Sequence, residues 1–127
     1  MSYDYVLDSS AWIEYFSGTK KGEEVQRLIE DKRIATSILA IAEVADKLLR
    51  SKITIEEKIA FIHTSAVVLP VTMGISVLAA QFKNSIREHN QKFSLIDGIH
   101  LATAQQHHAI FLTTDNDFKG IENVRLI

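Results

Sequence analysis

Four acidic residues lie at boundaries between predicted elements. Each either follows an apolar segment or lies close to the start of a predicted helix. They are Asp8, Glu43, Asp97 and Asp115. Asp8 ends the apolar run 5–7, and Asp115 lies in the acidic turn after the run 109–113, and both runs are typical of buried strands. Because parallel strands present their carboxyl ends to one crevice, we expect the four side chains to face a common crevice.

Carboxylates gathered in this way repel one another, and a divalent cation relieves that repulsion. The chain has no cysteine, so a metal site must be built from carboxylates, histidines or hydroxyls. Such hard oxygen ligands favour Mg²⁺ or Mn²⁺, which suits hydrolysis of a phosphodiester by an activated water. The other interpretation is purely structural, because Asp favours turns and helix caps and Asp8 can cap the segment that begins at Ala11.

Length and composition bound the other possibilities. The 127 residues, 46% of them hydrophobic, predict a single domain over 1–127 with one sheet and its helices. We see neither an apolar run of about 18 residues nor a signal peptide, so we expect a soluble, cytoplasmic protein with no membrane partner. The formal charge of −2 argues against a broadly basic coat for nucleic acid. A nucleic-acid partner would need local basic patches or bridging metal ions.

Strands and helices are predicted to alternate along the chain. Strands are expected over 5–7, 34–37, 67–71, 109–113 and 124–127, and helices over 23–31, from 38 onward, from 55 onward, over 75–86 and over 95–107. Thr54 and Ser94 each open a capping-box pattern, and Ser37 can cap the helix that begins at Ile38. The apolar stripe of that helix is predicted to consist of Ile38, Leu39, Ala42, Ala45, Leu48 and Leu49, with Glu43 beside it. This order predicts an α/β sandwich with a mostly parallel sheet.

Four segments together resemble a known family. They are Val6-Leu7-Asp8-Ser9-Ser10, Ile38-Leu39-Ala40-Ile41-Ala42-Glu43-Val44, Ser94-Leu95-Ile96-Asp97-Gly98-Ile99-His100-Leu101-Ala102-Thr103-Ala104 and Leu112-Thr113-Thr114-Asp115-Asn116-Asp117-Phe118. In this order, and in a domain of this length, they resemble the PIN-domain ribonucleases, most closely the VapC toxins of toxin–antitoxin pairs. The resemblance implies a PIN-like α/β/α sandwich over the whole chain. It also implies endonucleolytic cleavage of RNA dependent on Mg²⁺ or Mn²⁺, a homodimer, and inhibition by a small antitoxin protein.

The resemblance also assigns roles by position. The acids Asp8, Glu43, Asp97 and Asp115 match the metal-binding acids of the family, Ser9 or Ser10 matches its polar residue after the first aspartate, and Asp117 matches a frequent extra acid. We expect the three aspartates to hold the ion directly or through water, and Glu43 to orient or deprotonate the attacking water. Thr113 and Thr114 are expected to hold the acidic turn or to contact a phosphate. His100 follows Asp97 by one helical turn, so it could approach the site, but we favour a surface or otherwise satisfied histidine.

Two other functions fit parts of the pattern. A phosphoacceptor receiver domain has a similar length and gathers acids around Mg²⁺, but it needs an acceptor aspartate at a mid-chain strand end, and the strand 34–37 ends without one. A phosphatase with a nucleophilic aspartate would need a second aspartate where Ser10 stands. The remaining alternative is a non-catalytic PIN-like module that binds RNA, which the presence of all four acids disfavours.

Overall fold

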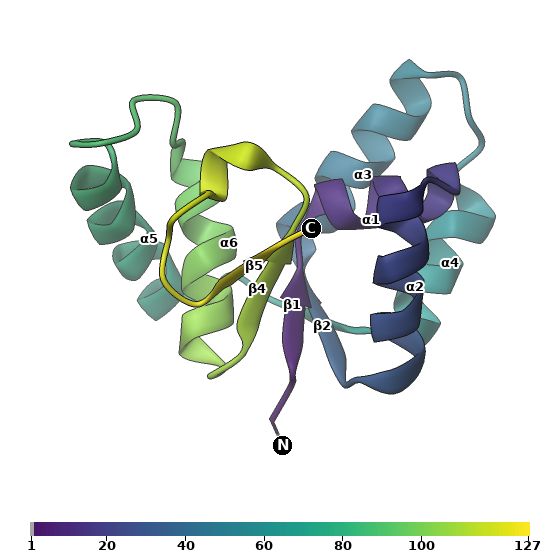
Figure 1. The fold of residues 1–127 in the computed structure, drawn as a ribbon, viewed down its shortest axis with the longest axis horizontal. Helices are drawn as coiled ribbons and strands as arrows, with labels where there is room; N and C mark the ends of the chain where they lie inside the picture. The colour runs from purple at the N-terminus through teal and green to yellow at the C-terminus, as the bar shows by residue number, and fades with distance from the viewer. Residues whose placement is uncertain (1) are drawn as a thin grey trace.

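The computed structural model describes residues 2–127, which form five strands and six α-helices around one sheet (Figure 1). In chain order these are β1 Tyr5–Leu7, α1 Ser9–Ser17, α2 Lys20–Asp31, β2 Ile34–Ser37, α3 Ile38–Arg50, α4 Glu56–Ser65, β3 Val67–Leu69, α5 Met73–Ile86, α6 Leu95–Gln106, β4 Ile110–Thr113, the short 3-10 helix η1 Asn116–Phe118 and β5 Val124–Leu126. Across the described part of the chain, none of the helices has the length and apolar character of a membrane span.

The sheet has the strand order β3-β2-β1-β4-β5, and all four neighbouring pairs are parallel. The predicted α/β fold with a mostly parallel sheet is therefore confirmed, with β1 at its centre and β5 at one edge. The order differs from the 2-1-3-4-5 order of receiver-like folds, so the receiver alternative is wrong. The strand order reverses between β1 and β4, which places the expected ligand crevice at the carboxyl ends of these two strands.

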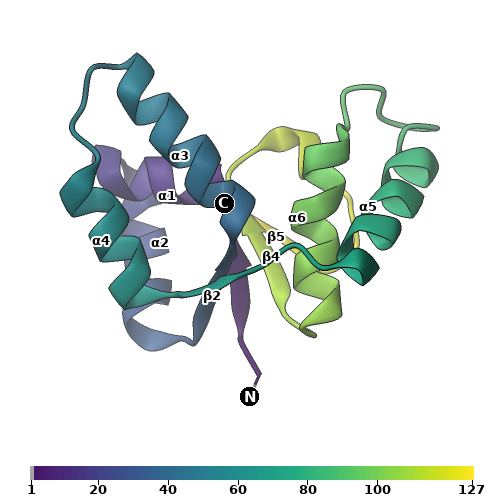
Figure 2. The ribbon, with the colours of Figure 1, turned by 180° about the vertical axis from the view of Figure 1, so that it is seen from behind.

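Helices cover both faces of the sheet, with α1 to α4 on one side and α5 and α6 on the other in both views (Figures 1 and 2). The side chains of β1 alternate between the two layers. Tyr5 and Leu7 pack with the first four helices around Trp12, whereas Val6 packs with Phe93, Phe111 and the α6 side of the core. Because both faces are covered, all three residues of β1 are buried, which explains why the strand is a continuous apolar run.

The helix starts agree with the sequence in two of three places. Ser37 caps α3 through the backbone N–H of Leu39, and Ser94 forms a reciprocal capping box at the start of α6. The predicted capping box at Thr54 is wrong, because α4 starts at Glu56 and Ile55 occupies its N-cap without a side-chain bond. Ile55 packs against the core around Trp12, so tertiary packing rather than local capping fixes this helix start.

The apolar stripe predicted for α3 is confirmed only at Leu48. The buried residues of this helix are Ala40, Val44 and Leu48, spaced four apart, whereas Ile38 and Leu49 are 46% and 57% exposed. The helix leaves the sheet immediately after β2, so the direction of the strand end fixes which side of the helix meets the core. Glu43 precedes the buried Val44 and lies at the border of the packed side, where its side chain reaches the carboxyl edge of the sheet.

The α5–α6 layer depends on one close backbone approach. A Cβ atom at Gly98 in α6 would lie 2.5 Å from the carbonyl oxygen of Ala79 in α5. Only glycine therefore allows the two helices to approach this closely. Since Gly98 follows Asp97 directly, the same contact positions the first turn of α6, which carries one of the predicted site residues.

Candidate active site

Asp8 lies at the end of β1 and is almost completely buried, with 4% of its surface exposed. It is the N-cap of α1, and its Oδ1 accepts hydrogen bonds from the Ala11 N–H at 3.0 Å and from the Ser10 hydroxyl at 2.7 Å. Its Oδ2 accepts from the Thr113 hydroxyl, at the end of β4, at 2.6 Å. Burial raises the pKa of Asp8 above its ordinary value of 3.8, against the opposing effect of these bonds.

Hydroxyl groups join the ends of β1 and β4. The Ser10 hydroxyl lies 3.2 Å from that of Thr113 and accepts from the Thr114 N–H at 3.0 Å. Thr113 Oγ1 in turn accepts from the Asp115 N–H at 3.0 Å. Ser10 and Thr113 therefore hold the acidic turn against Asp8, as predicted for Thr113. Of the two serines that the sequence offered, Ser10 rather than Ser9 makes the contact.

Asp115 is half-buried after β4 and is the N-cap of η1. Its Oδ1 accepts from the backbone N–H of Asp117 at 2.9 Å. Asp117 thus supports the turn through its main chain, and its backbone oxygen accepts from the Asn90 side-chain amide at 2.8 Å. The carboxylate of Asp115 keeps Oδ2 free of hydrogen bonds from the described residues.

Asp97 lies in the first turn of α6, where its Oδ2 accepts from the Ser94 N–H at 2.9 Å in the capping box. Its Oδ1 makes no bond to the described residues. Burial raises the pKa of Asp97 above 3.8, and the negative charge of Asp115 raises it further, so the two carboxylates face the same region. Asp8 and Asp97 share another neighbour, because a positive charge on His100 would lower the pKa of both.

For His100 the sequence favoured a surface or otherwise satisfied histidine over a place near the site, and the surface interpretation is wrong. His100 is 3% exposed rather than on the surface, and its Nε2 lies 2.6 Å from Oε1 of Glu43. Its ring lies parallel to Phe111, with 6.2 Å between centroids, and its buried Nδ1 has no hydrogen-bond partner among residues 2–127. His100 thus joins Glu43, on α3, to α6, the helix that carries Asp97. Its position one turn after Asp97, on the buried side of α6, was the only signal in the sequence.

The structure brings the four acids to one edge of the sheet without forming a closed cage. Within residues 2–127, no three Asp, Glu or His side chains converge closely enough to hold a single ion. The three aspartates each use one or both oxygens to fix a local turn, and Asp97 Oδ1, Asp115 Oδ2 and the second lone pair of Asp8 Oδ2 stay available. Oxygen donors of this kind fit Mg²⁺ or Mn²⁺ held by one or two carboxylates and completed by water.

Comparisons with solved structures show the same fold in several proteins. A chain of a toxin–antitoxin complex from Klebsiella pneumoniae is 23% identical, with a TM-score of 0.74 and 96% of each chain covered. VapBC2 from Rickettsia felis, bound to a DNA fragment from its promoter, is 16% identical, with a TM-score of 0.72 and coverage of 97% of this chain and 96% of that chain. VapC20 from Mycobacterium tuberculosis, described as a toxin that cleaves the sarcin–ricin loop, is 20% identical, with a TM-score of 0.70 and coverage of 96% and 99%.

Sequence comparison gives the family directly. Curated proteins provide no significant match to this chain. The model of the PIN domain family, however, matches residues 5–124, which include all four predicted acids, the strands β1 to β4 and the first residue of β5. Because this match extends over almost the whole sequence, the chain belongs to the PIN domain family.

Proposed function

We propose that this protein is an endoribonuclease dependent on Mg²⁺ or Mn²⁺, and that it is the toxin of a VapBC-type toxin–antitoxin pair. The observation that carries the proposal is the arrangement of Asp8, Asp97 and Asp115 at the switch point of the sheet. Each is fixed by protein hydrogen bonds and keeps an oxygen lone pair that no described residue uses. Membership of the PIN family and the similarity of the fold to a toxin that cleaves the sarcin–ricin loop support the same class of activity.

In the proposed mechanism the three aspartates hold the cation, directly or through its waters. When bound, the cation lowers the pKa of a water and stabilises the negative charge that develops on the scissile phosphate. Asp8 is rigid, because its two oxygens accept three hydrogen bonds, so it would fix the position of a bound cation relative to β1 and β4. Ser10 and Thr113 keep the acidic turn in register with Asp8.

Glu43 orients the attacking water or takes its proton. Its side chain is 41% exposed, so it is accessible to solvent and substrate, while the bond to His100 restrains its Oε1. His100 is a positioning residue in this account, since it acts through Glu43. The proton leaves to solvent through the exposed side of Glu43, which needs no buried relay.

We propose an antitoxin protein and a second copy of this chain as the partners, and RNA as the substrate. The support is the set of similar folds that occur in toxin–antitoxin and VapBC complexes. A mass measurement at micromolar concentration tests the dimer, and a strictly monomeric mass would remove it from the proposal.

Cleavage of a mixed RNA pool tests the activity. Wild type should cut with Mg²⁺ or Mn²⁺ and stop when EDTA is added. Asp8→Asn should lose activity by at least about 100-fold. Substitution of a residue that only supports a metal ligand typically costs about 10–100-fold, so the loss of a ligand should exceed that range. Asp31→Asn is the matched control, because this aspartate is 78% exposed on α2, and it should cut like wild type. Cleavage that persists in EDTA, or in Asp8→Asn, would overturn the metal mechanism.

A non-catalytic module that binds RNA is the second candidate, and the open spacing of the acids favours it. The same experiment separates the two. A module of this kind would retain RNA in a binding assay with each variant and would leave the pool intact with every divalent cation.

A further inference from the structure

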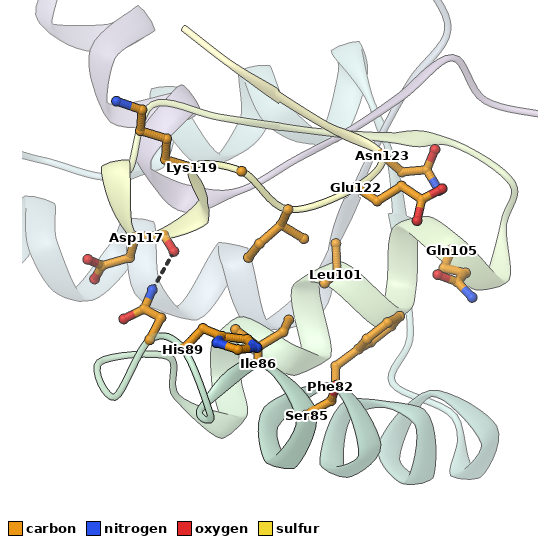
Figure 3. A pocket seen from close by; sticks show the side chains of 13 residues that line it. Phe82, Ser85, Ile86, His89, Leu101, Gln105, Asp117, Lys119, Glu122 and Asn123 are labelled. Atoms are coloured by element: carbon orange, nitrogen blue, oxygen red, sulfur yellow. Dashed lines mark hydrogen bonds between the residues drawn. The ribbon is translucent and has the colours of Figure 1, made fainter.

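A pocket of about 420 Å³ lies between α5, α6 and the segment that joins η1 to β5 (Figure 3). Its volume is in the range of small-ligand sites. Its floor is apolar and is formed by Phe82, Ile86, Leu101 and Ile121. Figure 3 shows Phe82 and Leu101 directed into the space between the α5–α6 layer and the overlying loop. The floor of the cavity therefore includes an aromatic ring.

The rim of the pocket is polar and carries little net charge. The amide side chains of Gln105 and Asn123 line one end of the pocket, at the right of Figure 3, and Lys119 is balanced by the acidic Glu122 and Asp117. A phosphate would meet more negative than positive charge here. A neutral, flat ring with hydrogen-bonding edges would instead find an aromatic neighbour, an apolar floor and amides that both donate and accept.

The pocket adjoins the acidic turn of the candidate active site. Asp117 lines the pocket, and its backbone N–H donates to Oδ1 of Asp115. Asn90 also lines the pocket, and its side-chain amide donates to the backbone oxygen of Asp117, as the dashed line in Figure 3 indicates. The single turn of η1 therefore separates the pocket from a proposed metal ligand, so both can act on one strand of nucleic acid.

We propose that this pocket binds one unstacked base of the RNA substrate, close to the phosphate that is cut. The proposal rests on the proposed ribonuclease function and adds a determinant of sequence preference to it. Recognition of single-stranded RNA commonly combines stacking on an aromatic side chain with hydrogen bonds to the base edge. Here Phe82 provides the stacking surface, and Gln105 and Asn123 read the edge.

Two variants test the pocket without touching the acids. Phe82→Leu keeps an apolar side chain in the floor and removes the ring. Gln105→Ala changes an exposed residue of α6, and Gln81→Ala, an exposed glutamine of α5 outside the pocket, is its matched control. Affinity is measured by fluorescence anisotropy with short single-stranded RNAs in EDTA, where the proposed nuclease is inactive. Each RNA is also made with one abasic nucleotide, moved along the chain.

We expect Phe82→Leu to weaken binding by about tenfold or more, Gln105→Ala by a smaller factor, and Gln81→Ala not at all. In wild type, one abasic position should cause a similar loss, and in Phe82→Leu that position should no longer matter. Equal affinity of all variants, or an abasic effect that survives in Phe82→Leu, would overturn the proposal. Such a result would favour a protein segment as the occupant of the pocket.

The outcome for the subsite is separate from the outcome for the nuclease. Pocket-dependent binding with no cleavage in Mn²⁺ would support the subsite and overturn the proposed activity. Cleavage that is lost in Asp8→Asn but has the same sequence preference in wild type and Phe82→Leu would do the reverse. Failure of wild type to bind any RNA in EDTA or with Ca²⁺ would overturn the subsite as well.

Discussion

Replacement of Asp8 gives a sharp test, because this residue has both a structural and a proposed catalytic task. In the metal-free protein its carboxylate is buried, and burial raises its pKa, so the charged form opposes folding at neutral pH. Asp8→Asn removes the charge and retains an oxygen that can accept from Ser10 and Ala11. The new amide can donate to the Thr113 hydroxyl. We therefore expect metal-free Asp8→Asn to be at least as stable as wild type.

Asp8→Ala removes the same charge and also the hydrogen bonds. Loss of the N-cap of α1 costs about 1 kcal/mol. Loss of the acceptor for the Ser10 and Thr113 hydroxyls costs about 1 kcal/mol each. Asp8→Ala should thus be about 2–3 kcal/mol less stable than Asp8→Asn. For a domain of this size that difference corresponds to a melting temperature about 10 °C lower.

The melts are recorded at pH 7 in EDTA and then with Mn²⁺. A ligand that binds only the folded state at 100 times its Kd adds about 2.7 kcal/mol, so wild type should melt several degrees higher with Mn²⁺. Asp8→Asn should gain much less. The reasoning fails if Asp8→Asn responds to Mn²⁺ like wild type, or if it is as unstable in EDTA as Asp8→Ala.

Three further results are expected. In a double-mutant cycle, Glu43→Gln and His100→Gln should show a coupling energy of only about 1 kcal/mol, since Glu43 is partly solvated. Denaturant unfolding measures this coupling energy, and additive effects would contradict the hydrogen bond between Glu43 and His100. Gly98→Ala should lower stability by about 2 kcal/mol in thermal melts, because its Cβ would meet a backbone carbonyl of α5; an unchanged melting temperature would contradict that contact. In EDTA, the raised pKa values of Asp8 and Asp97 mean that these groups bind protons more tightly in the folded state than in the unfolded state. The free energy of unfolding should therefore fall as the pH rises from about 4 through these pKa values, and thermal melts should show a shallower fall in Asp8→Asn.

Features set by neighbouring residues were predictable from the sequence. The apolar runs before Asp8 and Asp115 became buried parallel strands, and Ser94 formed the capping box that places Asp97 in the first turn of α6. These outcomes depend on the strand period, on burial and on bonds that span three residues. The position of Glu43 in the site came from the family resemblance, because no local pattern distinguishes it from other helical acids.

Features set by distant residues were not predictable. The buried side of α3 follows from the direction in which β2 delivers the chain, and the sequence pattern around Ile38 and Leu49 does not encode that direction. The contact between His100 and Glu43 joins α6 to α3 across the strand ends, and it depends on the β2-β1-β4 order. A sequence pattern of period 3.6 gives the side of one helix and says nothing about which helix it will meet.

The structure also changes how the acids themselves should be interpreted. Capping and metal binding were opposed explanations in the sequence, yet Asp8 and Asp115 are N-caps in the fold and Asp97 completes a capping box. At Asp97 and Asp115 the bond to the helix start uses one carboxylate oxygen and leaves the second without a bond from the described residues. A hydrogen bond that holds one carboxylate oxygen also fixes the direction of the other oxygen, which a ligand for an ion with strict geometry requires. Helix starts at the carboxyl edge of a parallel sheet can therefore serve as supports for a metal site, and substitutions that keep the cap and remove the charge separate the two tasks.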